Sequence, residues 1–292
     1  MKTGAPPCTC ANELGPDMQL EPTGERMIVD AYQSSPEGRL IYLMHIATYQ
    51  FAEAFTRGRR VLDFGCGSGY GTAMIARTAR EVVGVDVAEE AVAFARAEHV
   101  APNLLFSRIA ADARLPFDDA SFDTVLSFQV FEHVEDEQQY LREIVRVLAE
   151  NGTLVLATPD RITRLFPFQQ PWNRWHLREY SEKSLRRQLE RQFADTQIMK
   201  MGGNREVIDI ELQRCRRLKY LSVPFTLPFY PRALRVALLN LVHKLRGNPG
   251  AGDRPLAEVA TFDESALSIA PGLSPSLNLV AVARRSSVPA SD

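Results

Sequence analysis

The sequence has few cysteines, little net charge and no long apolar run. Its four cysteines, Cys8, Cys10, Cys66 and Cys215, are too few and too scattered for a disulfide framework. No second cysteine pair or histidine cluster lies near Cys8 and Cys10, so we interpret them as free thiols and expect no metal site. A net charge of −2 argues against a protein that binds nucleic acid through its overall charge.

Targeting and membrane-spanning signals are also missing. Residues 1–16 contain one lysine and no apolar stretch, unlike a secretory signal. The nearest approach to a membrane span, Leu221 to Leu245, is interrupted by prolines and arginines. We therefore expect a cytoplasmic protein.

The middle of the sequence alternates short apolar runs with helical patterns. Strands are expected at 59–67, 81–87, 104–112, 122–130 and 152–160, with helices at 70–80, 88–100 and 136–150. Such alternation is typical of βαβ units, in which helices cover both faces of a parallel sheet. The predicted fold class is α/β.

The flanking regions are less regular. Residues 39–55 have helical spacing, 161–178 form a loop rich in proline and aromatic residues, and Ser181 precedes a predicted helix at 182–193. Residues 195–201 are a candidate sixth strand, and 277–285 a closing edge strand. We expect a flexible tail at 1–20, a helical lid at 21–57, one domain at 58–286 with an insertion at 212–247, and a tail at 287–292. Two separate domains are the alternative.

A glycine-rich turn follows the first strand, in the sequence VLDFGCGSGYG at 61–71. Glycine allows the backbone to turn sharply and approach a ligand closely. Gly65, Gly67 and Gly69 do not match a dinucleotide fingerprint, because Tyr70 stands where glycine or alanine is needed, and no P-loop lysine follows. Asp63 just before the turn is better suited to a cationic group than to a pyrophosphate.

Three carboxylates stand at the ends of successive predicted strands, where open α/β sheets bind ligands. Asp63 suits a cationic amino-acid group, Asp86 the two hydroxyls of a ribose, and Asp112 the exocyclic amine of a base. S-adenosylmethionine combines these three parts. Any one of these aspartates, taken alone, is more often a helix cap or a surface loop residue, but all three at successive strand ends favour a binding site.

Residues 61–159 resemble a known family. The segments VLDFGCGSGYG, VVGVDVAEEAVAFA, and ADARLPFDDASFDTVLSFQVFEHVEDEQQYLREIVRVLAENGTLVLATP are similar to class I S-adenosylmethionine-dependent methyltransferases of the type 11 group. This resemblance implies a Rossmann-like fold with a seven-stranded, mostly parallel sheet. GER at 24–26 and NRWHLREY at 173–180 are similar to methyltransferases that act on surface glycans, glycolipids or secondary metabolites.

The resemblance also assigns cofactor-binding residues. It implies that the methionine end of S-adenosylmethionine lies at Asp63, Gly65, Cys66, Gly67 and Tyr70, with Gly69 in the same turn. The ribose would lie at Asp86 and Val87, and the adenine at Asp112 and Ala113. The sulfonium would lie beside Gln129. We interpret Cys66 as a small residue tolerated in a tight turn and not as a nucleophile.

A hydroxyl acceptor needs a base, and histidine suits that role near neutral pH. His133 follows the fourth strand, and His176 lies in the loop after the fifth with Glu179 three residues on. These three residues are the candidates for catalysis. The alternatives are a packing or capping role for His133 and a purely structural loop around His176. We expect His45, on an apolar helix face, to be a core or cofactor-lid residue.

The predicted function is methylation of an oxygen on a sugar, glycolipid or small hydroxylated metabolite. The alternatives are C- or N-methylation of a small molecule, or a non-catalytic protein that binds S-adenosylmethionine. Expected partners are a small-molecule, glycan or lipid-linked substrate and no nucleic acid. Residues 212–247 contain Lys and Arg but no Asp or Glu. They are expected either to contact the inner face of a membrane or to form a helix that covers the substrate cleft.

Overall fold

The computed structural model describes residues 35–111, 114–246 and 262–285. The predicted tails at 1–20 and 287–292, residues 21–34 of the predicted lid, the Cys8–Cys10 pair, and Asp112 with Ala113 lie outside the described residues.

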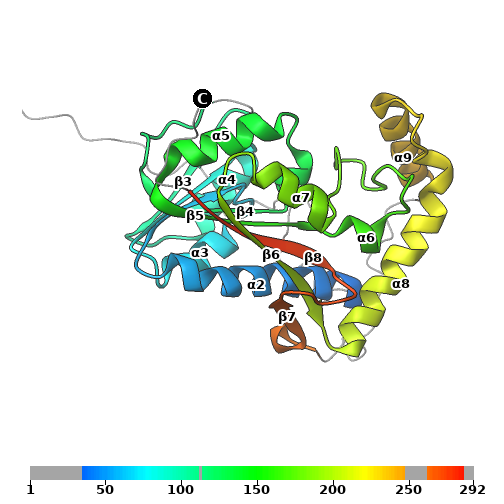
Figure 1. The fold of residues 1–292 in the computed structure, drawn as a ribbon, viewed down its shortest axis with the longest axis horizontal. Helices are drawn as coiled ribbons and strands as arrows, with labels where there is room; N and C mark the ends of the chain where they lie inside the picture. The colour runs from blue at the N-terminus through cyan, green and yellow to red at the C-terminus, as the bar shows by residue number, and fades with distance from the viewer. Residues whose placement is uncertain (1–34, 112–113, 247–261, 286–292) are drawn as a thin grey trace, which may run out of the picture.

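Eight strands form one sheet in the order β3-β2-β1-β4-β5-β8-β6-β7 (Figure 1). Neighbouring strands from β3 to β5 are parallel, whereas β8 is antiparallel to β5 and β6, and β7 is antiparallel to β6. The strands are β1 (Arg60–Phe64), β2 (Glu81–Asp86), β3 (Leu104–Arg108), β4 (Phe122–Phe128), β5 (Leu148–Pro159), β6 (Asp195–Gly203), β7 (Leu267–Ala270) and β8 (Asn278–Arg284). The predicted α/β class, with a mostly parallel sheet, is confirmed.

Two strand predictions are corrected. The sheet has eight strands where seven were expected, because the short β7 pairs with the end of β6. The predicted edge strand at 277–285 is wrong in position, since β8 lies between β5 and β6. Residues 278–283 are buried throughout, which explains why 279–283 form a continuous apolar run.

Helices cover both faces of the sheet. The main helices are α2 (Pro36–Thr56), α3 (Tyr70–Ala76), α4 (Glu89–Glu98), α5 (Glu137–Val147), α6 (Arg161–Arg164), α7 (Glu182–Leu189), α8 (Arg205–Ser222) and α9 (Arg232–Arg246), with short 3₁₀ turns η1 (Phe131–His133), η2 (Val223–Phe225) and η4 (Glu264–Ala266). Side chains from α2, α3 and α4 share one core with the sheet, and those from α5 and α7 share the other.

Polar side chains cap the first turns of several helices. The side chains of Ser35, Asp136 and Ser181 accept backbone N–H bonds at the first turns of α2, α5 and α7, as N-cap residues do. Four predicted helices end early: the one expected at 70–80 ends at Ala76, the one at 136–150 at Val147, the one at 88–100 at Glu98 and the one at 182–193 at Leu189. In the second case, the residues from Leu148 onward belong to β5, which pairs with β4 through a register shift.

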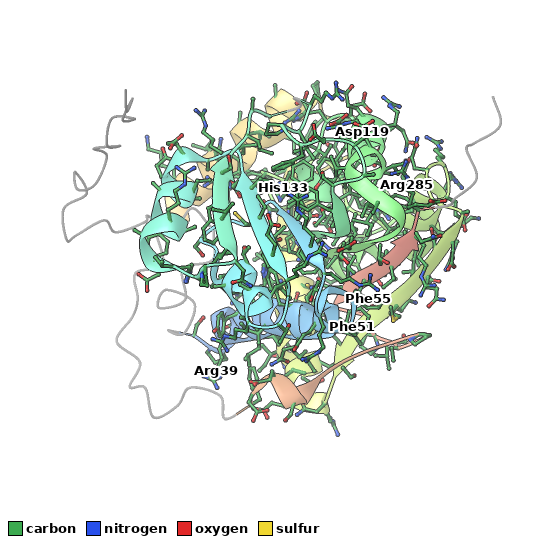
Figure 2. All side chains as sticks on the ribbon, turned by 90° about the vertical axis from the view of Figure 1, so that its left-hand side faces the viewer. Arg39, Phe51, Phe55, Asp119, His133 and Arg285 are labelled. Atoms are coloured by element: carbon green, nitrogen blue, oxygen red, sulfur yellow. The ribbon has the colours of Figure 1, made fainter. Side chains whose placement is uncertain are left out.

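Helix α2 contacts both the sheet and α8. Tyr49 and Ala52 are buried in the core that α2 shares with the sheet, and Phe51 and Phe55 pack against this core (Figure 2). Nearer its start, Leu40 is buried in a cluster with Val207 of α8. The helix predicted at 39–55 is therefore confirmed, and it connects the glycine turn region to the α8 side of the molecule.

The basic segment 212–247 begins inside α8, which starts at Arg205, and continues through η2 into α9. In Figure 1, α8 and α9 extend from the side of the sheet formed by β6 and β7. Among the described residues, no helix combines the length and the apolar character needed to cross a membrane.

Candidate active site

The turn after β1 has an open space at its centre. Gly65, Gly67 and Gly69 all have left-handed backbone angles, with φ values of 91°, 53° and 81°. A Cβ atom at Gly65 would lie 2.2 Å from Val130 Cγ2, and one at Gly69 would lie 2.7 Å from Ala95 Cβ, whereas one at Gly67 would have nothing within 4 Å. Packing therefore requires glycine at the two outer positions, and Gly67 leaves room for a ligand.

Asp63, at the end of β1, is buried with one unpaired oxygen. Its Oδ2 accepts hydrogen bonds from the hydroxyls of Tyr49, at 3.0 Å, and Thr72, at 2.7 Å. Its Oδ1 has no hydrogen-bond partner among the described residues. Burial raises the pKa of Asp63 to about 6, despite these two hydrogen bonds. Such a carboxylate is well placed to receive a cationic group.

Asp86, at the end of β2, holds the glycine turn in place. Its Oδ2 accepts the backbone N–H of Gly67 and its Oδ1 that of Ala88, both at 2.9 Å. Each carboxylate oxygen keeps a second lone pair that can accept a ligand hydroxyl. Val87 beside it is half exposed.

The other described residues of the predicted cofactor set lie around the same turn. Cys66 is buried, and burial together with the charges of Asp63 and Asp86 raises the pKa of its thiol. A protonated, buried thiol is a poor nucleophile. The Tyr70 ring packs edge-on to Tyr49, with centroids 5.8 Å apart. Gln129 has a left-handed φ of 57° and donates its backbone N–H to Ala157.

A second, polar pocket of about 190 Å³ opens where β4 and β5 end. Gln129 and Pro159 contribute from the strand ends, and α2 contributes His45. Burial lowers the pKa of His45 to about 4, so its imidazole is neutral at physiological pH. The remaining lining residues include Glu132, His133, Arg164, Trp172, Asn173, His176, Glu211, Arg214 and Asn278.

The structure brings His133 and His176 together in this pocket. Their rings meet edge to face with centroids 4.9 Å apart, although the residues are far apart in the sequence. His133 belongs to η1, directly after β4 (Figure 2), and its Nδ1 lies 3.2 Å from the carbonyl oxygen of Trp175. His176 is buried in the loop that follows α6.

Glu179 orients His176 and is itself held by Arg164. Its Oε1 lies 2.9 Å from His176 Nδ1, and its Oε2 accepts from Arg164 Nε at 3.0 Å. Burial alone would raise the pKa of Glu179, but Arg164 and His176 bring it down to about 2. The carboxylate therefore stays ionised and fixes the imidazole with its proton on Nδ1 and its lone pair on Nε2.

Several of the pocket's residues are not among the three predicted catalytic residues. Glu132 is fully buried, with Oε2 bonded to the Thr158 hydroxyl and Oε1 without a partner among the described residues. Arg214 pairs with Glu211 at 2.5 Å in α8. From the sequence, Glu132 is only the next candidate base after the two histidines. Arg214 lies in the segment 212–247, interpreted as a basic insertion, and Glu211 lies just before it.

Comparison with known proteins identifies similar sequences and similar folds. Residues 62–156 match the family model described as a methyltransferase domain. A probable S-adenosylmethionine-dependent methyltransferase from Mycolicibacterium smegmatis is 38% identical over 58% of this chain and 63% of its own length. A protein of the same description from Mycobacterium tuberculosis is 38% identical over 56% of this chain and 57% of its own. The chain thus matches less than two thirds of the length of either relative.

Other relatives are more distant. A ubiquinone biosynthesis O-methyltransferase from Maricaulis maris is 32% identical over 37% of this chain and 44% of its own length. Among solved structures, an S-adenosylmethionine-dependent methyltransferase from Thermotoga maritima covers 84% of this chain and 91% of its own, with 14% identity and a TM-score of 0.53. One from Mesorhizobium loti covers 83% and 100%, with 18% identity and a TM-score of 0.51.

The two structural likenesses show the fold alone, whereas the family model and the curated relatives match in sequence. The predicted resemblance to S-adenosylmethionine-dependent methyltransferases of the type 11 group is confirmed, because residues 62–156 match a methyltransferase domain and the relatives that match in sequence are described as probable S-adenosylmethionine-dependent methyltransferases.

Proposed function

We propose that the protein transfers a methyl group from S-adenosylmethionine to a hydroxyl oxygen of a sugar, glycolipid or small hydroxylated metabolite. The observation that carries this proposal is the pair of imidazoles, His133 and His176, in a polar pocket at the strand ends next to the glycine turn. Gln129 lines this pocket, and its neighbour Val130 packs on Gly65 of the turn.

The residues of the glycine turn fit this cofactor. The unpaired Oδ1 of Asp63 suits its ammonium group, the space over Gly67 admits its methionine part, and the Asp86 oxygens can accept the ribose hydroxyls. When bound, S-adenosylmethionine supplies a methyl group on a sulfonium, and the C–S bond breaks with its electron pair left on sulfur as the acceptor oxygen forms the new O–C bond.

The chain's own contribution at the acceptor end is to orient the hydroxyl and to help remove its proton. Glu179 accepts from Arg164 and from Nδ1 of His176, and this fixes the His176 lone pair on Nε2. His133 Nδ1 donates in the same way to the Trp175 carbonyl, which places its lone pair on Nε2 as well. Two oriented imidazoles favour a hydroxyl acceptor, whose proton must be lost, over an acceptor that reacts without a base.

The O-methyltransferase among the relatives supports the same choice of acceptor atom. The test is a methyl-donor consumption assay against sugar nucleotides, lipid-linked glycans and phenolic metabolites. With the best acceptor, His176→Ala and His133→Ala should each retain binding of S-adenosylmethionine and lower turnover by ~10²–10⁴-fold. Near-wild-type turnover in both variants would rule out a role of these imidazoles in proton removal.

We also propose that the α8–α9 region contacts an anionic membrane or a lipid-linked substrate. This region carries exposed apolar side chains, at Tyr220, Leu221, Phe229, Leu234 and Leu241. Arg216 and Arg217 are exposed in the same region, and apolar groups flanked by cations favour an anionic lipid surface.

Co-sedimentation with vesicles tests this contact. Binding should require anionic lipid and should weaken in Phe229→Ser, because Phe229 is 71% exposed and loses its apolar contact. Val100→Ser is the matched control, since Val100 is 87% exposed but follows α4, outside this region. Equal binding of both variants, or no binding to anionic vesicles, would contradict the proposal.

A further inference from the structure

A carboxylate and two imidazoles converge in the acceptor pocket. One ligand atom from each of Glu132, His133 and His176 lies within 4.8 Å of the other two. We infer that these three side chains bind one divalent transition-metal cation, which holds the oxygen atoms of the acceptor.

The two imidazoles are oriented as metal-binding histidines are. A histidine that binds a metal through one nitrogen usually donates its other N–H to a carboxylate or a backbone carbonyl. His176 Nδ1 lies 2.9 Å from Glu179 Oε1, and His133 Nδ1 lies 3.2 Å from the Trp175 carbonyl oxygen. Both partners are acceptors, so both lone pairs are on Nε2, the second nitrogen that can bind a metal.

Glu132 supplies an independent observation. Its side chain is fully buried, and Thr158 donates to Oε2 at 2.9 Å, but Oε1 has no partner among the described residues. A buried carboxylate oxygen without a partner is energetically unfavourable. A cation bound between Oε1 and the imidazoles would satisfy it.

The ligand set indicates which cations would fit. Two imidazoles and one carboxylate suit Mn²⁺, Fe²⁺, Co²⁺ or Zn²⁺, whereas Mg²⁺ and Ca²⁺ prefer oxygen ligands. Ligand atoms at roughly 2.1 Å from a cation lie about 3–3.5 Å apart, so modest side-chain rotation would close the site. Three protein ligands leave coordination positions open for other groups.

Nearby positive charges would not repel a cation from this site. Arg164 and Arg214 line the pocket, but Arg164 is paired with Glu179 and Arg214 with Glu211. Each of these guanidinium charges is thus balanced by a carboxylate, and the Glu132 side chain adds a carboxylate oxygen as a ligand for the cation.

The cation would act on the acceptor, and this role of the cation rests on the proposed O-methylation. A hydroxyl bound to a divalent cation loses its proton to water more readily, and the oxygen keeps the electron pair that forms the bond to carbon. The two imidazoles then assist proton loss as ligands of the cation. Open coordination positions favour an acceptor with two neighbouring oxygens, such as a vicinal diol or a hydroxyl beside a carbonyl.

Direct cation binding tests the site without any substrate. After the full chain is stripped with EDTA, Mn²⁺ is titrated and followed by electron paramagnetic resonance, with Co²⁺ absorption as a second readout. We expect one cation per chain and much weaker binding of Mg²⁺. Glu132→Gln and His133→Ala should each weaken Mn²⁺ binding by about 100-fold or more, since even outer partners of a metal site contribute 10–100-fold.

His99→Ala is the matched control, because His99 is the C-cap residue that follows α4 and its ring lies near that of Phe106. It should bind Mn²⁺ as the wild type does. Thermal unfolding confirms that each variant is folded, and the two separate ligand variants keep the test valid if one of them is not. Absence of a bound cation in the wild type, or equal binding in the folded variants and the control, would overturn the inference.

Two further measurements separate this inference from the proposed function. S-adenosylmethionine binding should survive EDTA, whereas methyl transfer should be lost and should return with Mn²⁺ or Co²⁺. Methyl transfer that persists in EDTA would overturn the cation's role and leave O-methylation standing. Stoichiometric Mn²⁺ binding with no methyl transfer to any hydroxyl would support the site and overturn the proposed function.

Discussion

Arg235 of α9 is hydrogen-bonded to the backbone of His176. Its Nη2 donates to the His176 carbonyl oxygen at 2.9 Å, and its Nη1 donates to the Pro171 carbonyl oxygen at 2.6 Å. Although it belongs to a basic helix, the Arg235 side chain is only 1% exposed. Part of the basic segment therefore holds the loop that carries His176.

Loss of Arg235 should reduce turnover and leave cofactor binding intact. In Arg235→Met, the loop carbonyls lose charged hydrogen bonds worth ~1.5–3 kcal/mol, and His176 is held less firmly. We expect turnover to fall at least tenfold with an unchanged affinity for S-adenosylmethionine. Arg232→Met is the control, because its pair with Glu135 is exposed and contributes little. Equal turnover in the two variants would show that Arg235 does not position the loop.

Asp63→Asn should stabilise the ligand-free protein and weaken cofactor binding. Burial raises the pKa of Asp63 to about 6 from an ordinary value of 3.8, so ionisation of this group costs folding free energy at neutral pH. The uncharged Asp63 carboxyl stabilises the folded protein relative to the ionised form. This stabilisation is fully present below pH 3.8 and is lost as the pH rises through 6. Removing the charge should raise the free energy of unfolding at pH 7.5 by up to ~3 kcal/mol.

Denaturant titrations of wild type and Asp63→Asn at pH 5 and pH 7.5 check this. The advantage of the variant should be smaller at pH 5, where much of the wild-type carboxylate is already protonated. An advantage that does not change with pH would contradict the account, as would an unchanged affinity for S-adenosylmethionine at pH 7.5.

Gly67→Val should abolish cofactor binding in a folded protein. The new side chain would occupy the open space over the glycine turn. Gly58→Val is a close control, because Gly58 also has a positive φ and a Cβ there would have nothing within 4 Å, but it lies in the turn after α2. Both variants carry similar backbone strain, of ~1–2 kcal/mol. Calorimetry should detect loss of binding in the first variant alone; a similar loss in both would assign the effect to strain.

Asp86→Ala should weaken binding of S-adenosylmethionine by ~1.5–3 kcal/mol, since it removes a charged acceptor for the ribose hydroxyls. The variant also frees the backbone N–H of Gly67, which loosens the turn. Asp209→Ala, at an exposed position in α8, should bind as the wild type does. Unchanged affinity in Asp86→Ala would place the ribose elsewhere.

The sequence was sufficient to predict the βαβ core, because its strands are continuous apolar runs and the glycine turn is a local signal. The position of β8 between β5 and β6 could not be predicted, since strand order depends on long-range pairing. β7 was missed because a four-residue strand has too few residues to show a pattern.

The candidate site was predictable only in part. The positions of Asp63 and Asp86 in the site could be predicted, because both lie at strand ends. The contact of His133 with His176 depends on how the loop after β5 folds back, and it could not be predicted. The roles of Arg164 and Arg235 had no signal in the sequence, because both act through contacts formed only in the folded chain.

The most direct test of the whole account is calorimetric titration of S-adenosylmethionine and its demethylated product into the full-length protein. Both ligands should bind in the micromolar range, with one ligand per chain, and binding should be lost in Gly67→Val but not in Gly58→Val. Absence of binding to the folded wild-type protein would contradict the account.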